Sequence, residues 1–185
     1  MSYQYVLKNQ GGRYGGVSVN ESAVEFIKTI LDEGKTILEL GSGPGSTVGL
    51  GKIYKLYSVE NQPEWCDKFR EYTTYINCRS KSYNKVYTKP DGFPNDQAWY
   101  DPDDLFPNLP INYDLILVDG PGGYSHGWGR GGFFKHIGEF NTNVPIIFDD
   151  VNDPEKGGIL MRKISEYTNR PFKILDTDKA TGYIL

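Results

Sequence analysis

The stretch Thr36-Ile37-Leu38-Glu39-Leu40-Gly41-Ser42-Gly43-Pro44-Gly45 decides how this chain folds. Its first five residues are mostly apolar, which predicts a short buried strand over 36–40. The glycines that follow let the backbone turn sharply and approach a ligand closely, because no Cβ stands in the way. Ligands of open α/β sheets lie beyond the carboxyl ends of the strands. We therefore expect a ligand-binding loop directly after this strand.

The pattern on both sides of this loop predicts strands that alternate with helices. Apolar residues at helical spacing predict a helix from Asn20 to Glu33, and Pro63 suits the first turn of a helix that reaches Tyr72. The last two strands are separated by too few residues for a crossover helix, so the final strand should be antiparallel. A further helix is expected over 153–168, and further strands over 54–60, 85–88, 113–119, 144–148, 172–175 and 182–185.

These elements predict an α/β fold, namely a Rossmann-like, doubly wound, mostly parallel seven-stranded sheet with an antiparallel last strand. The length of 185 residues suits one domain over residues 1–185. Residues 1–16 form a glycine-rich N-terminal segment that we expect to serve as a lid.

Composition excludes several classes of partner. The net charge of -4, with no run of Lys and Arg longer than two, argues against nucleic acid. No apolar stretch is long enough for membrane insertion and no signal pattern is visible, so we expect a soluble, cytoplasmic protein. In a cytoplasmic protein we expect Cys66 and Cys78 to be reduced thiols. The alternative is a single disulfide between them.

The glycine spacing separates three kinds of nucleotide loop. A dinucleotide fingerprint needs glycine or alanine where this chain has Ser46, and a P-loop needs Ser or Thr where Gly51-Lys52 is followed by Ile53. The alternative is that the glycine loop is a tight turn that binds no ligand. The acidic residue followed by Gly41, Gly43 and Gly45 resembles class I S-adenosylmethionine-dependent methyltransferases.

Glu60 ends the second expected strand, where a carboxylate can accept both ribose hydroxyls of an adenosyl ligand. The alternative is an exposed glutamate at the end of a strand. With the resemblance, this order of elements implies a methyl-donor site. Its residues would be Glu39, Gly41, Ser42, Gly43, Gly45, Ser46, Glu60, Asn61 and Asp119.

Three aspartates follow two other expected strands. Asp119 ends the strand in Val-Asp-Gly-Pro, and Asp149 and Asp150 end the next one. Neighbouring parallel strands lie about 5 Å apart, so these carboxylates should repel one another unless a cation or hydrogen-bond donors join them. Oxygen ligands suit Mg²⁺ or Mn²⁺, which would lower the pKa of an acceptor hydroxyl. Alternatively, one or two of them cap a following helix or turn.

The aspartates resemble the ligand set of metal-dependent sugar and catechol-type O-methyltransferases. The segments Val118–Tyr124, Gly129-Arg130 and Asp150-Val151-Asn152 also resemble plant glucuronoxylan 4-O-methyltransferases, within a similarity over residues 35–170. That family has His-Asp where this chain has Asp149-Asp150, so Asp149 is either a ligand or a neighbour of one. The resemblance implies a sugar or glycan hydroxyl as the acceptor.

Most of the remaining candidates lie in glycine-rich segments. His126, Asp119 or Asp150 could act on the substrate proton, although His126 could equally be an exposed loop histidine. Arg130 could hold the carboxylate of an acidic sugar, or lie on the surface. Arg13 could reach the donor or the acceptor, Tyr124 and Trp128 could stack on a sugar, and His136 is expected to be structural.

Several other functions remain as alternatives. One is methylation of a catechol-like small molecule, and another is a non-catalytic module that binds an adenosyl cofactor. Methylation of nucleic-acid amines is disfavoured because Asp119-Gly120-Pro121-Gly122 replaces the usual Asn-Pro-Pro-Tyr type of clamp. A nicotinamide enzyme is disfavoured by Ser46.

Overall fold

The computed structural model describes residues 19–82, 98–121, 130–152, 157–175 and 180–185. Its main sheet contains β1 (Thr36–Leu40), β2 (Lys55–Glu60), β3 (Thr74–Asn77), β6 (Leu115–Val118), β7 (Ile146–Phe148), β8 (Phe172–Leu175) and β9 (Thr181–Ile184). The seven strands lie in the order β3-β2-β1-β6-β7-β9-β8. β9 pairs antiparallel with β7 and β8, and the other pairings are parallel. The predicted α/β, Rossmann-like sheet with an antiparallel last strand is confirmed.

Side chains alternate between the two faces of the sheet and so build two apolar layers. Ile37 and Leu38 are neighbours in β1 and both are fully buried, yet they belong to different apolar clusters. The cluster of Ile37 contains residues of α2 (Glu21–Ile30) and α3 (Ser46–Leu50). The cluster of Leu38 contains residues of α6 (Gly131–Lys135) and α7 (Ile159–Thr168). Helices therefore cover both faces, as a doubly wound sheet requires.

Helix α2 forms where the helical spacing predicted it. The side chain of Asn20 accepts a hydrogen bond from Ser22 N at 3.4 Å and caps the first turn. Ala23, Val24 and Ile27 form the buried face. In the described ranges no helix is both long and apolar enough to cross a membrane.

The helix expected from Pro63 to Tyr72 is wrong, because this segment forms successive hydrogen-bonded turns. Cys66 N donates to Gln62 O at 3.0 Å, as in a helix, but the next residue, Asp67, has φ of +59°. This left-handed conformation interrupts a right-handed helix. The chain then enters the edge strand β3, which the sequence pattern did not predict. The strand expected over 85–88 lies outside the described residues.

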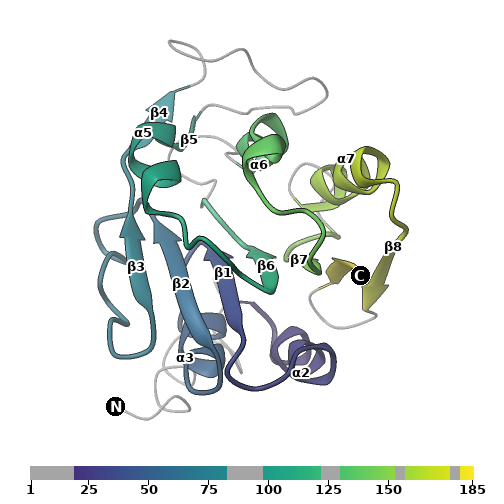
Figure 1. Cartoon of the computed structure of the whole chain (residues 1–185), viewed down its shortest axis with the longest axis horizontal. Coiled ribbons are helices and arrows are strands. Elements are labelled where there is room, and N and C mark those ends of the chain that lie inside the picture. Colours follow the sequence, from purple (N-terminus) through teal and green to yellow (C-terminus); the bar gives the residue numbers. More distant parts are fainter. Residues whose placement is uncertain (1–18, 83–97, 122–129, 153–156, 176–179) are drawn as a thin grey trace.

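A two-stranded ribbon stands beside one end of the main sheet. It consists of β4 (Ser80–Ser82) and β5 (Ala98–Tyr100), paired antiparallel. The short helices α5 (Pro102–Leu105) and η1 (Phe106–Asn108) follow β5, and η2 (Ile137–Glu139) follows α6. Figure 1 shows β4, β5, α5 and α6 near the end of the sheet to which the arrows of β2 and β3 point. These elements therefore lie near the strand ends where ligands of such sheets bind.

Candidate active site

The loop after β1 rests on close contact between two glycines. Gly41 has φ of +91°, a conformation that favours glycine. A Cβ on Gly41 would lie 2.7 Å from the Cα and the N of Gly120, which lies two residues after β6. Gly120 N also donates to Leu40 O at 2.5 Å. The segments after β1 and β6 therefore meet through backbone alone.

Glu60 joins this loop from the end of β2. Its side chain is buried, and Oε2 accepts hydrogen bonds from both the N and the Oγ of Ser42 at 3.0 Å each. Oε1 accepts from the N of Asn61 at 2.7 Å and the N of Gln62 at 2.9 Å. Four donors thus fix the orientation of the carboxylate beside the glycine loop. Glu60, Ser42 and Asn61, which we predicted for the methyl donor, lie together.

Asn61 extends this part of the site toward the ribbon. Its side-chain Nδ2 donates to the Oγ of Ser80 in β4 at 2.5 Å. Its buried Oδ1 has no hydrogen-bond partner among the residues that the structure describes. One acceptor atom beside Glu60 is therefore not used by any residue in the described ranges.

Glu39 lies beneath the glycine loop. It is fully buried, and its Oε2 accepts hydrogen bonds from Thr47 Oγ1 at 2.8 Å and Ser58 Oγ at 2.5 Å. Thr47 Oγ1 in turn accepts from Gly43 N at 2.9 Å. Glu39 therefore shapes the loop through Thr47, a residue that the sequence pattern did not select. Burial raises the pKa of Glu39 to about 7, although hydrogen bonds from hydroxyls, including that of Ser46, oppose the shift.

The three predicted aspartates converge, as parallel strand ends should. Asp119 follows β6, and Asp149 and Asp150 follow β7. One carboxylate oxygen from each lies within 4.8 Å of those of the other two. Asp149 is fully buried, and Asp150 has φ of +57°, a strained conformation that non-glycine residues often adopt at functional sites.

Arg130 lies among these aspartates rather than on the surface. Its Nη2 is 3.1 Å from Asp119 Oδ1 and 3.0 Å from Asp150 Oδ2. Nη1 donates to the carbonyl oxygen of Asp149 at 2.9 Å, and Nη2 donates to that of Asp119. Burial acts to lower the pKa of Arg130, but the three aspartates outweigh it and raise the pKa. A protein cation therefore offsets part of the negative charge of the acidic cluster, and both terminal nitrogens of the guanidinium are in use.

The structure does not test every predicted residue. The candidates Arg13, Tyr124, His126 and Trp128 lie outside the described residues. His136 follows α6 and stacks on Trp99 with ring centroids 5.0 Å apart, in keeping with a structural role. Burial lowers the pKa of His136 to about 4, so its ring is neutral at physiological pH.

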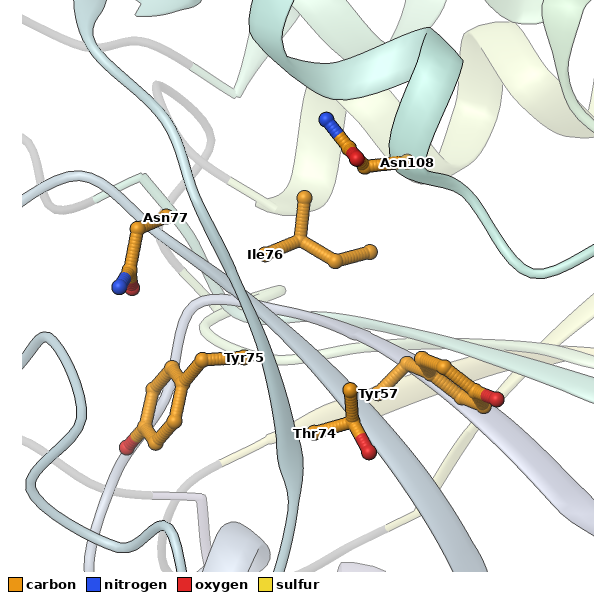
Figure 2. Close-up of a pocket in the computed structure, with 6 residues that line it drawn as sticks. All are labelled: Tyr57, Thr74, Tyr75, Ile76, Asn77 and Asn108. Carbon is orange, nitrogen blue, oxygen red and sulfur yellow. The ribbon is translucent and has the colours of Figure 1, made fainter.

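A separate hollow of about 340 Å³ lies beside β3, the strand at one end of the sheet order. Figure 2 shows Ile76 and Tyr75 on opposite sides of this strand, with Ile76 on the side of Asn108. The pairing of Asn77 with Glu60 brings one end of the hollow to the level of the site. No aspartate of the cluster lines it. Its lining residues are Tyr57, Thr74, Tyr75, Ile76, Asn77 and Asn108.

The chain resembles known proteins in its structure but not in its sequence. No family model matches the chain, and no curated protein matches it in sequence. Among solved structures, the C-terminal domain of precorrin-6Y C5,15-methyltransferase from Rhodobacter capsulatus aligns over 92% of this chain and 91% of its own. The TM-score is 0.57 at 9% identity. The chain therefore shares the α/β, Rossmann-like fold of this methyltransferase domain.

Two further methyltransferase structures contain ligands. A Podospora anserina methyltransferase bound to S-adenosylhomocysteine aligns with a TM-score of 0.55 at 14% identity, over 98% of this chain and 84% of its own. MycE methyltransferase from the mycinamycin biosynthetic pathway was solved with magnesium, S-adenosylhomocysteine and mycinamycin VI. It aligns with a TM-score of 0.53 at 12% identity, over all of this chain and 54% of its own.

Within the methyltransferase fold, the site lies where the order of strands reverses. β2 and β6 flank β1 on opposite sides, so the glycine loop stands between Glu60 and Asp119. Such a switch point is the usual place for a ligand in an open parallel sheet.

Proposed function

We propose that this chain is an S-adenosylmethionine-dependent O-methyltransferase that acts on a carbohydrate hydroxyl with the help of a divalent metal ion. The observation that carries the proposal is the convergence of the glycine loop, Glu60 and three aspartates at one edge of the sheet. The loop and Glu60 suit a methyl donor, and the aspartates suit an acceptor hydroxyl. The ligands of the structural neighbours support the first half.

The donor half of the site has the shape and polarity that an adenosyl group needs. The contact between Gly41 and Gly120 leaves no room for a Cβ, so backbone alone forms this part of the loop. The carboxylate of Glu60 accepts the ribose hydroxyls, sharing Oε2 with Ser42 and Oε1 with the backbone N–H groups of Asn61 and Gln62. Asn61 Oδ1 provides a further acceptor. S-adenosylmethionine supplies the methyl group that is transferred.

The acceptor half has the donor atoms that a hard divalent cation prefers. Asp119, Asp149 and Asp150 would hold Mg²⁺ or Mn²⁺, since their carboxylate oxygens lie within 4.8 Å of one another. When bound, such a cation lowers the pKa of a nearby hydroxyl. MycE, which aligns with this chain at 12% identity, was solved with magnesium.

Arg130 sets a condition on metal binding. Its ion pairs with Asp119 and Asp150 already provide positive charge at the cluster. A metal ion on these carboxylates would have to compete with the guanidinium for them. Arg130 therefore either yields these contacts to the ion or stands in for it, and we propose the former.

The residues proposed to bind and deprotonate the acceptor are assigned from the sequence pattern. We propose Asp119, Asp150 or His126 for the substrate proton. For binding the acceptor we propose Arg13, Tyr124 and Trp128, and also Arg130 once it has yielded its contacts with the aspartates to the metal ion. A carbohydrate acceptor follows from the resemblance of the segment around Asp119 to glucuronoxylan 4-O-methyltransferases. We expect no nucleic-acid partner, because the net charge is -4.

Methyl transfer from labelled S-adenosylmethionine to a glycan panel tests this function, with Mg²⁺, Mn²⁺ or a chelator present. We expect a labelled sugar ether, loss of labelling with the chelator, and at least about a hundredfold loss in Asp119→Asn, typical for removal of a group that moves a proton. Asp32→Asn, on an exposed residue, is the matched control. Labelling that survives the chelator would remove the metal from the mechanism, and no labelled glycan would remove the carbohydrate acceptor.

A further inference from the structure

We propose that Tyr100 is an additional methyl-donor contact: its buried hydroxyl, unpartnered beside Gly120, donates a hydrogen bond to an oxygen of the bound donor. This inference rests on the proposed binding of S-adenosylmethionine. It adds a residue from the β4–β5 ribbon to a site otherwise built from the ends of β1, β2 and β6.

The ribbon is tied to the main sheet close to Glu60. Cys78 N, just before β4, donates to Glu60 O at 2.8 Å, and Asp101 N, just after β5, donates to Arg79 O at 2.8 Å. Lys81 in β4 forms an ion pair with Asp101 at 3.0 Å. Tyr100 therefore belongs to a segment that is held from both strands of the ribbon.

Packing fixes the direction of the Tyr100 side chain. Its neighbour Trp99 is fully buried and stacks on His136, so β5 is anchored on the apolar cluster of the sheet. Tyr100 is itself fully buried. A Cβ on Gly120 would lie 2.5 Å from Tyr100 Oη and 2.6 Å from Gly41 Cα. The phenol oxygen thus lies against Gly120, beside the contact between the two glycines.

The hydroxyl has no hydrogen-bond partner within the described ranges of the chain. Burying a hydroxyl without a partner is unfavourable, and phenylalanine would fill the same space without that penalty. Burial raises the pKa of Tyr100 well above its ordinary value, and the charges of Glu60 and Asp119 act in the same direction. The phenol therefore keeps its proton and can act as a donor.

The position of the Tyr100 hydroxyl indicates its ligand. The hydroxyl lies against Gly120, which follows Asp119 and contacts Gly41, and Ser42 in the same glycine loop donates to Glu60. A donor held by Glu60 through its ribose carries ribose and carboxylate oxygens. Each of these can accept the proton of the phenol.

Tyr113→Phe provides a matched control, because Tyr113 is buried in the same apolar cluster and has a partner. Its hydroxyl accepts a hydrogen bond from Asn141 N at 2.7 Å. Removal of this hydroxyl leaves a backbone N–H without its partner. Removal of the Tyr100 hydroxyl leaves no group of the described residues unpaired.

Calorimetric titration with S-adenosylhomocysteine and thermal unfolding of the ligand-free protein together test the proposal. We expect Tyr100→Phe to keep or raise the Tm and to weaken binding about tenfold, the value of one hydrogen bond. We expect Tyr113→Phe to lower the Tm and to leave the affinity unchanged.

Unchanged affinity in Tyr100→Phe, when the wild-type protein binds, would overturn the role of Tyr100 alone. A lowered Tm in Tyr100→Phe would also overturn it, since the hydroxyl would then have a partner in the free protein. Absence of binding by the wild-type protein would instead overturn the proposed function.

Discussion

Arg130 Nη2 lies 3.1 Å from Asp119 Oδ1, and both side chains are at least nine-tenths buried, with exposed fractions of 6% and 10%. The same nitrogen contacts Asp150 at 3.0 Å. The acidic cluster that the sequence predicts as a metal site is therefore also an ion-pair network. This arrangement makes the stability of the protein sensitive to Arg130 and to added cations.

Arg130→Met should destabilise the fold by about 3 kcal/mol or more, because it leaves buried carboxylates without their counter-charge. Added Mg²⁺ should restore part of this loss, and the gain in Tm should exceed that of the wild-type protein. Urea and thermal unfolding with and without MgCl₂ measure both effects. Arg170→Met is the control, since Arg170 donates to the carbonyl oxygens of Val144 and Leu185 at 3.1 Å each. An equal response of the two variants to Mg²⁺ would argue against a cation site.

Gly120→Ala should damage both folding and cofactor binding, because its Cβ would clash with Gly41 and Tyr100. Overpacking of this kind costs about 1–3 kcal/mol. Gly138→Ala is the matched control, since a Cβ there meets no atom within 4 Å. Chemical unfolding and titration with S-adenosylhomocysteine compare the two. A Gly120→Ala variant with wild-type stability and affinity would show that the close contact is not needed.

Glu39 should make stability depend on pH. Its folded-state pKa is raised from 4.5 to about 7, so the folded protein retains a proton that the unfolded chain has released. The contribution of Glu39 to stability therefore falls as pH rises from about 4.5 to about 7, by roughly 3 kcal/mol in all. Glu39→Gln should lack this contribution.

The difference in unfolding free energy between Glu39→Gln and wild type, measured from pH 4.5 to pH 8, isolates this effect. Comparison with the wild type is necessary because His136, with its lowered pKa, acts in the opposite direction and loses stability as pH falls. A difference that does not change with pH would mean that Glu39 is ionised over the whole range.

The sequence predicts the centre of the sheet better than its surroundings. Strands such as Thr36–Leu40 and Leu115–Val118 are apolar and bounded by turn residues, so local pattern alone identifies them. The sequence does not predict the strand Thr74–Asn77, because the segment before it has the pattern of a helix. The left-handed conformation of Asp67, which interrupts that helix, is visible only in the structure.

For the site as well, the sequence predicts some features and not others. Glu60 and the three aspartates follow strands, so chain order and parallel pairing predict that they converge. The contacts of Arg130 and Tyr100 depend on how segments after β6 and β5 pack in three dimensions. No local pattern distinguishes a surface arginine from one buried among aspartates.

Titration of the wild-type protein and Glu60→Ala with S-adenosylhomocysteine tests the central claim most directly, with the exposed Glu33→Ala as control. The wild-type protein and the control should bind in the micromolar range. Glu60→Ala should bind at least about tenfold more weakly, because the ribose hydroxyls lose a charged acceptor. Absence of binding by the wild-type protein, or equal binding by Glu60→Ala, would contradict the account.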